Sequence, residues 1–154
     1  MAAKSLVVFK RLGGSSLGRW LFSRLICQRA PYFSTIGPLI EELAPGRCVV
    51  RVRDRRRVHN HIGTVHAIAL CNAAELAAGL ATDATIAESQ RWIPKGMTVR
   101  YLRKATGTLV ATARVSTPPA DAPAQEAHAL VEVRDAGGGV VFHADIVMWI
   151  SARA

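Results

Sequence analysis

The strongest constraint on the fold is a long apolar segment in the middle of the chain, residues 66–81, which reads HAIALCNAAELAAGLA. Alanine and leucine dominate this segment, and both are strong helix formers. Apolar side chains fall on almost every side of the helix that it would form, which is typical of a buried helix. Its only acidic residue is Glu75. We therefore expect the rest of the chain to pack around this one helix.

Segments on either side of this helix alternate between apolar and polar residues, which is the pattern of half-buried strands. The expected elements are a helix over 17–29, an irregular strand over 32–43, a strand over 48–52, and strands over 97–101, 109–115, 129–134 and 142–150. Short turns join the last four strands, which predicts antiparallel neighbours along the chain. An antiparallel sheet wrapped around one apolar helix is an α+β fold.

The chain has 154 residues, about the length of one domain. We expect a weakly patterned basic arm over 1–16 and a single domain over 17–154. The three cysteines, Cys27, Cys48 and Cys71, are far apart and form no CxxC pair. This usage is typical of reduced thiols in a cytoplasmic protein. The N-terminus lacks the pattern of a signal peptide, and an arginine-bearing transit peptide is the minority alternative.

The formal net charge is +9, and residues 1–30 hold six basic residues and no acid. A second basic cluster lies at 51–57. Such clusters attract nucleic acid, lipid headgroups or phosphate-bearing small molecules. Neither has the interleaved aromatic residues or the motif of a nucleic-acid site, so we expect no nucleic-acid partner and keep such binding as a third alternative. No apolar run reaches the ~18 residues of a membrane span, and the N-terminal pattern is too weak for firm binding to an anionic surface.

The segment that carries chemistry runs from a polar loop into the start of the apolar helix. The first amides of a helix are unpaired and the helix dipole is positive there, so this loop and helix start can bind an anion or an oxyanion. Asn60 adds a side-chain amide donor in the loop, with a turn residue that bonds the backbone of its own loop as the alternative. Glu75, an isolated carboxylate in an apolar helix, is a candidate general base, with a buried structural acid as the alternative.

Other possible sites have weaker support. His59, His61 and His66 could suggest a metal site, but no cysteine or carboxylate completes a recognisable ligand set. Cys71 lies within the apolar helix and is expected to be a core residue rather than a nucleophile. The chain's GxSxG match at residues 14–18 follows no predicted strand, so it is no nucleophile elbow, which disfavours a serine hydrolase of the α/β type. We therefore expect neither a metal nor a redox cofactor.

Helix geometry limits how Ala67 and Glu75 can cooperate. Eight residues separate them, and eight helical residues span about 12 Å. The Ala67 amide and the Glu75 carboxylate of one chain therefore cannot both touch one reacting carbonyl. If both act, Glu75 comes from a second chain, and a two-fold dimer would have two equal sites.

The residues Asn60, His66, Ala67 and Glu75 resemble a motif of the hotdog-fold acyl-CoA thioesterase superfamily. In its phenylacetate-pathway and 4-hydroxybenzoyl-CoA thioesterases, an Asn stands seven residues before a helix-start Gly of an HGG triplet. An Asp or Glu stands eight residues after that Gly. Both spacings are present here, and the resemblance covers roughly residues 17–150.

The resemblance implies a hotdog fold with an extra N-terminal helix, and an enzyme that hydrolyses an acyl-CoA thioester as a homodimer or homotetramer. It also implies a role for each matching residue. The Ala67 amide would polarise the thioester carbonyl, Asn60 would orient the water or the carbonyl, His66 would shape the helix start, and Glu75 of the partner would be the general base or nucleophile.

Residues 97–107 also resemble a segment of that fold, a strand followed by a basic turn and a glycine. By this resemblance Arg100, Arg103 and Lys104 would contact the phosphates of coenzyme A, as would the cluster at 55–57, because guanidinium groups pair well with phosphate. Gly63, in the loop before the helix, would border the bound substrate.

The HGG triplet itself is replaced here by His66, Ala67 and Ile68. Ala67 still supplies a backbone N–H, but Ile68 narrows the mouth where glycine would allow close approach of substrate. The second hypothesis is therefore a non-catalytic protein that keeps the fold and binds acyl-CoA or a fatty acyl group.

Overall fold

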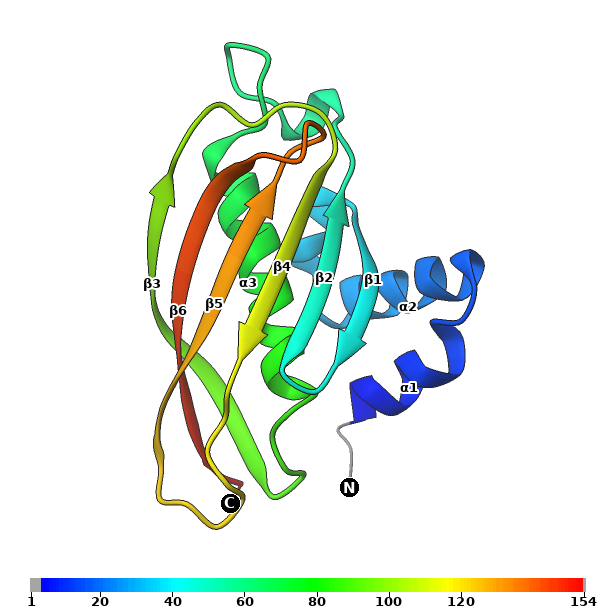
Figure 1. Cartoon of the computed structure of the whole chain (residues 1–154). Helices are drawn as coiled ribbons and strands as arrows, with labels where there is room; N and C mark the ends of the chain where they lie inside the picture. The colour runs from blue at the N-terminus through cyan, green and yellow to red at the C-terminus, as the bar shows by residue number, and fades with distance from the viewer. Residues whose placement is uncertain (1–3, 154) are drawn as a thin grey trace.

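A computed structural model describes residues 4–153, in which a curved six-stranded antiparallel sheet wraps around one helix, α3 (Figure 1). The helices are α1 (Lys4–Leu12), α2 (Ser16–Arg29) and α3 (Ala67–Asp83), with short 3₁₀ turns at Pro31–Ile36 and Arg56–Val58. The strands are β1 (Pro38–Ala44), β2 (Arg47–Val52), β3 (Gln90–Tyr101), β4 (Leu109–Val115), β5 (Gln125–Arg134) and β6 (Val140–Ala152). The predicted α+β class is confirmed.

The central helix α3 packs against the sheet through small side chains. Its buried residues include five alanines between Ala69 and Ala78, as well as Gly79 and Ala81. Small side chains let the helix backbone approach the strands closely, and the dense interior that results contributes dispersion energy. The predicted helix over 66–81 is thus confirmed, although one strip along it is not covered, as described below.

The strand order differs from the prediction at one point. The strands lie in the order β1-β2-β4-β5-β6-β3, so β3 pairs with β6 and β4 pairs with β2. The sequence predicted β3 and β4 as neighbours because the turn between them is short. Residues 102–108 instead cross the end of the sheet (Figure 1). β3 pairs with β6 from Gln90↔Ala152 to Tyr101↔Phe142. These residues are far apart in the sequence, so a local turn signal cannot predict the pairing.

The N-terminal segment is a packed helix rather than a weakly patterned arm. Leu6 of α1 is 1% exposed, and Phe9 meets Phe22 of α2 edge-to-face with 5.1 Å between the ring centroids. Ser15 begins α2 by accepting a hydrogen bond from the Gly18 amide at 3.0 Å, as expected for a helix cap. The predicted helix over 17–29 is confirmed, and a domain boundary at residue 16 stays a prediction.

Within residues 4–153 no helix has both the length and the apolar character needed to cross a membrane.

If α1 is an integral part of the fold, removing its buried side chain will destabilise the whole protein. We expect Leu6→Ala to lower the free energy of unfolding by about 2–5 kcal/mol, as for other buried leucines. Val7→Ala, at a neighbouring position that is 38% exposed, should change it by less than about 0.5 kcal/mol. Urea unfolding followed by circular dichroism measures both. Equal, small effects would mean that α1 does not pack on the domain in solution.

Candidate functional site

Two loops and the start of α3 meet at one end of the sheet. The loop before α3 and the 102–108 loop are joined by the Val65 amide, which donates to the Ala105 carbonyl at 2.9 Å. A second link is the Gly107 amide, which donates to Asp54 Oδ2 at 2.8 Å, while His59 Nε2 bonds the other Asp54 oxygen. The hydrogen bond from His59 lowers the pKa of the Asp54 carboxyl, and the Gly107 bond adds to this effect.

The first turn of α3 has one free amide. His66 is the N-cap, and its Nδ1 accepts a hydrogen bond from the Ile68 amide at 3.1 Å. The Ala69 amide is paired with the His66 carbonyl at 2.9 Å. Among the described residues no acceptor bonds the Ala67 amide, which is only partly buried. The helix start can therefore donate the Ala67 N–H to a carbonyl oxygen or an oxyanion.

Asn60 uses its side chain within its own loop. Its Oδ1 accepts from the Ile62 and Thr64 amides, each at 3.1 Å, and its Nδ2 donates to Thr64 Oγ1 at 2.8 Å. Gly63 closes this turn with φ +77°, a left-handed conformation that favours glycine. The structure therefore places Asn60 and Gly63 in the entrance loop, and their roles toward substrate stay predictions.

Glu75 lies on an uncovered strip of α3 rather than deep in the core. Ile68 is 54% exposed, and Cys71 and Glu75 are half-buried. Residues 67, 71 and 75 are spaced by four, so they follow one another along one face of the helix. The Glu75 carboxylate and the free Ala67 amide thus share a face but lie about 12 Å apart along the axis. The sequence did not predict this strip, because most of the residues around Glu75 are apolar.

Tyr101 is a site residue that the motif comparison missed. Its hydroxyl lies 3.1 Å from Cys71 Sγ, between the positions of Ala67 and Glu75 on the helix face. This hydrogen bond raises the pKa of Tyr101 to about 12, with burial adding to the effect, so the hydroxyl stays protonated. Cys71 is half-buried rather than a core residue. The alternation of Met97, Val99 and Tyr101 already indicated that Tyr101 faces the helix.

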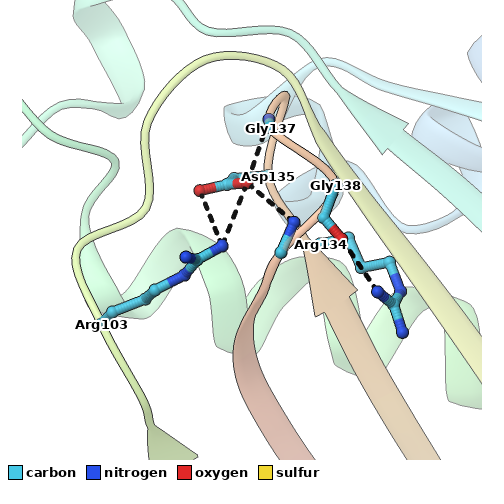
Figure 2. Close-up of polar contacts among 6 residues, drawn as sticks. Arg103, Arg134, Asp135, Gly137 and Gly138 are labelled. Carbon is cyan, nitrogen blue, oxygen red and sulfur yellow. Dashed lines mark hydrogen bonds and ion pairs between the residues drawn. The ribbon is translucent and has the colours of Figure 1, made fainter.

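The predicted phosphate-binding residues separate into two groups. Arg103 and Lys104 lie in the 102–108 loop, at the same end of the sheet as the start of α3. Arg103 pairs with Asp135 of the β5–β6 hairpin at 3.4 Å, as Figure 2 shows, and it lies across Gly139, where a Cβ would be 1.4 Å from its Nη2. Arg100 is on the other face of the sheet from α3, opposite His143. The structure therefore does not bring Arg100 to the site of its own chain.

The three histidines of the loop are not gathered at one point. His59 binds Asp54, His66 caps α3, and His61 is exposed. Among residues 4–153 no three His, Cys, Asp or Glu side chains are arranged to hold a metal ion.

Comparison with known proteins assigns the chain to a family. A family model described as a domain of unknown function, DUF4442, matches residues 18–150. The chain belongs to the DUF4442 family. A crystal structure of the genomics target APC5556 is 46% identical to it, covering 97% of this chain and 98% of that chain, with a TM-score of 0.83. None of the curated proteins matches the sequence.

More distant structures identify the fold of this DUF4442 protein. The thioesterase HI1161 from Haemophilus influenzae is 14% identical, covers 83% of this chain and 87% of that chain, and has a TM-score of 0.72. A thioesterase family protein from Silicibacter pomeroyi is 20% identical, covers 85% and 96%, and has a TM-score of 0.70. The fold is the hotdog fold that such thioesterases share, which confirms the fold predicted from the motif.

The link between Asp54 and the two loops should depend on pH. Because the folded-state pKa of Asp54 is lowered, its contribution to stability is present above the unfolded-state value of ~3.9 and is lost as the pH falls through the folded value. We expect Asp54→Asn to lower the melting temperature at neutral pH, and the difference from wild type to narrow below about pH 4. Melting temperatures between about pH 7 and about pH 3 measure this.

Asp121→Asn, in the exposed 117–124 loop, is the matched control for Asp54→Asn. Its melting temperature should equal that of the wild type at every pH tested. A difference between Asp54→Asn and wild type that is independent of pH would contradict the role of the Asp54 carboxylate.

Proposed function

We propose that this DUF4442 protein is an acyl-CoA thioesterase that hydrolyses its substrate by water attack at a site shared by two chains. The observation that carries the proposal is the free Ala67 amide on the same uncovered face of α3 as Glu75. Oxyanion donors and a carboxylate base are the two groups that thioester hydrolysis needs. The hotdog fold shared with thioesterases supports this choice of reaction.

In the proposed reaction the Ala67 N–H binds the thioester carbonyl oxygen. Glu75 takes a proton from water as the water oxygen bonds to the carbonyl carbon, and negative charge collects on the oxygen beside Ala67. Collapse of this tetrahedral intermediate breaks the carbon–sulfur bond, and the proton held by Glu75 passes to the leaving thiolate. The products are the free acid and coenzyme A, and no redox step is needed.

The 12 Å between Ala67 and Glu75 means that the two groups at one carbonyl come from different chains. A two-fold dimer that pairs the uncovered strips of two α3 helices would bring each Glu75 to the partner's helix start. Exposed Ile68 gives this surface an apolar centre. β3 has β6 as its one neighbour among the described strands, so its other edge is available for pairing with a second chain. Two such dimers could pair again to a homotetramer.

The coenzyme A phosphates would bind at the basic end of the sheet. Lys104 is exposed, and Arg53, Arg55 and Arg56 are exposed in the loop that leads to α3. Arg103 would first have to leave Asp135 to contact a phosphate. His66 would hold the helix start in shape through its bond to the Ile68 amide, and Asn60 would fix the entrance loop beside the substrate.

Proline at position 67 tests the amide directly. Proline lacks the N–H but is well tolerated at the first position of a helix, and His66 already has the extended backbone that precedes proline, with φ −65° and ψ 139°. We expect Ala67→Pro to lower kcat by about 10²–10³-fold, the usual cost of losing one oxyanion donor, while the melting temperature does not fall. Ala67→Gly keeps the N–H and should keep most of the activity.

Replacing Glu75 tests the base. We expect Glu75→Gln to lower kcat by at least about 10²-fold while coenzyme A binding, measured by calorimetry, is unchanged. Glu42→Gln, which removes a surface ion pair with Arg47, is the control. Thiol release from acetyl-, octanoyl-, palmitoyl- and benzoyl-CoA is the assay. Binding of acyl-CoA without hydrolysis of any of them by the wild type would favour the non-catalytic binding protein.

Mixing the two inactive variants tests whether the site is shared. In a mixed dimer of Ala67→Pro and Glu75→Gln chains, one of the two sites has an intact amide and an intact carboxylate. Random reassembly should therefore recover about a quarter of wild-type activity. A mixture that stays inactive, although light scattering shows dimers that exchange chains, would exclude a shared site.

A further inference from the structure

A cavity of about 1100 Å³ lies between the N-terminal helices and the second half of α3. Glu75 and Gly79 of α3 line one side, and residues of α1 and α2 line the other. Its volume is slightly above the range of about 300–1,000 Å³ that is usual for pockets that hold small organic ligands. The cavity is separate from the basic end of the sheet, because its other α3 lining residues, such as Leu80 and Asp83, lie further toward the end of the helix.

Twelve of the twenty residues that line this cavity are apolar. These apolar residues include Val8, Phe22, Leu25, Leu76, Ile86 and Trp92. Two of these apolar side chains are exposed to solvent: Leu25 is 42% exposed and Val8 is 37% exposed. An apolar ligand in the cavity would remove this surface from water, which is favourable by about 25 cal/mol for each Å².

Apart from Glu75 in the middle of α3, the charged residues of the lining lie at or beyond the ends of helices and strands. Lys4 begins α1, Arg29 ends α2, Asp83 ends α3, Glu88 lies in the loop after α3, and Arg153 follows β6. Asp83 is held by a hydrogen bond from Ser5. The middle of the cavity is thus bordered by side chains that suit a hydrocarbon.

Gly79 and Trp92 determine the shape of the cavity beside Glu75. The Trp92 ring lies over Gly79, and a Cβ at position 79 would be 2.7 Å from the ring. A larger residue would therefore push the indole out of its place in the wall. Gly79 is one turn after Glu75, so the apolar wall begins next to the carboxylate.

We propose that this cavity holds the acyl chain of the substrate, which makes the substrate class aliphatic acyl thioesters rather than small or polar ones. The inference rests on the proposed function, because it places the reacting carbonyl at Glu75. From there the hydrocarbon runs along α3 between Leu25 and Trp92, toward Asp83. Glu75 to Asp83 is again eight helical residues, about 12 Å, so a chain of medium length is accommodated.

Paired substitutions on α2 and α1 test this placement. Leu25→Trp fills the cavity, whereas Leu21→Trp adds the same ring at a position on the same helix that is equally exposed, at 42%, but lies outside the lining. We expect Leu25→Trp to lower kcat/KM for octanoyl-CoA by about tenfold or more and to change that for acetyl-CoA by less than about twofold. Leu21→Trp should match the wild type on both substrates. Val8→Trp and Val7→Trp form a second pair with the same expected contrast.

A binding measurement separates this inference from the enzymatic proposal. Trp92 lines the cavity, so a bromine-labelled fatty acid bound there should quench its fluorescence. The quenched component should be absent in Trp92→Phe and weakened in Leu25→Phe, which fills the cavity without adding an indole, but not in Leu21→Phe.

The outcomes are distinct. Quenching of Trp92 without hydrolysis of any acyl-CoA would support the cavity and overturn the enzymatic proposal. If neither Leu25→Trp nor Leu21→Trp changes hydrolysis at any chain length, and Trp92 is not quenched, the cavity assignment is overturned. The enzymatic proposal would then stand.

Discussion

The sheet can close around α3 because the buried face of this helix is made of small side chains. Alanines and Gly79 allow the helix to approach the strands and Trp92 closely, and most of the core residues on the strands pack on that face. Larger residues at these positions would overpack the interior, and such a substitution typically costs about 1–3 kcal/mol. The curvature of the sheet, the place of β3 at its edge and the position of both candidate catalytic groups follow from this contact.

The same helix also carries the candidate site, on the strip that the sheet does not cover. Ala67 offers its free amide because it is the first residue of the helix, and Glu75 can remain half-exposed because no strand packs over it. Burial of one face holds the other face rigidly, so the amide and the carboxylate are fixed without contacts of their own. A second chain placed on this strip would complete two sites at once and cover the exposed Ile68.

Periodicity was sufficient to predict the elements but not their partners. The helix over 66–81, the strands from 109 onward and the glycine-rich hairpin at 135–139 follow from local patterns, and the structure has all of them. The pairing of β3 with β6 was missed, because strand pairing depends on distant residues that no local signal identifies. The first helix was missed because its nine residues are fewer than the roughly 11 over which helical periodicity is read, although Leu6 and Phe9 are buried.

The sequence alone determined that a helix of small apolar residues would be the centre of an antiparallel sheet, and that Ala67 and Glu75 would be two turns apart on it. These are consequences of composition and of the fixed rise of a helix. Only the tertiary structure decided which face of α3 stays uncovered, that Asn60 bonds within its own loop, and that Arg100 lies on the far side of the sheet. It also decided that α1 and α2 border a cavity beside Glu75, because only packing brings together segments that are far apart in the sequence.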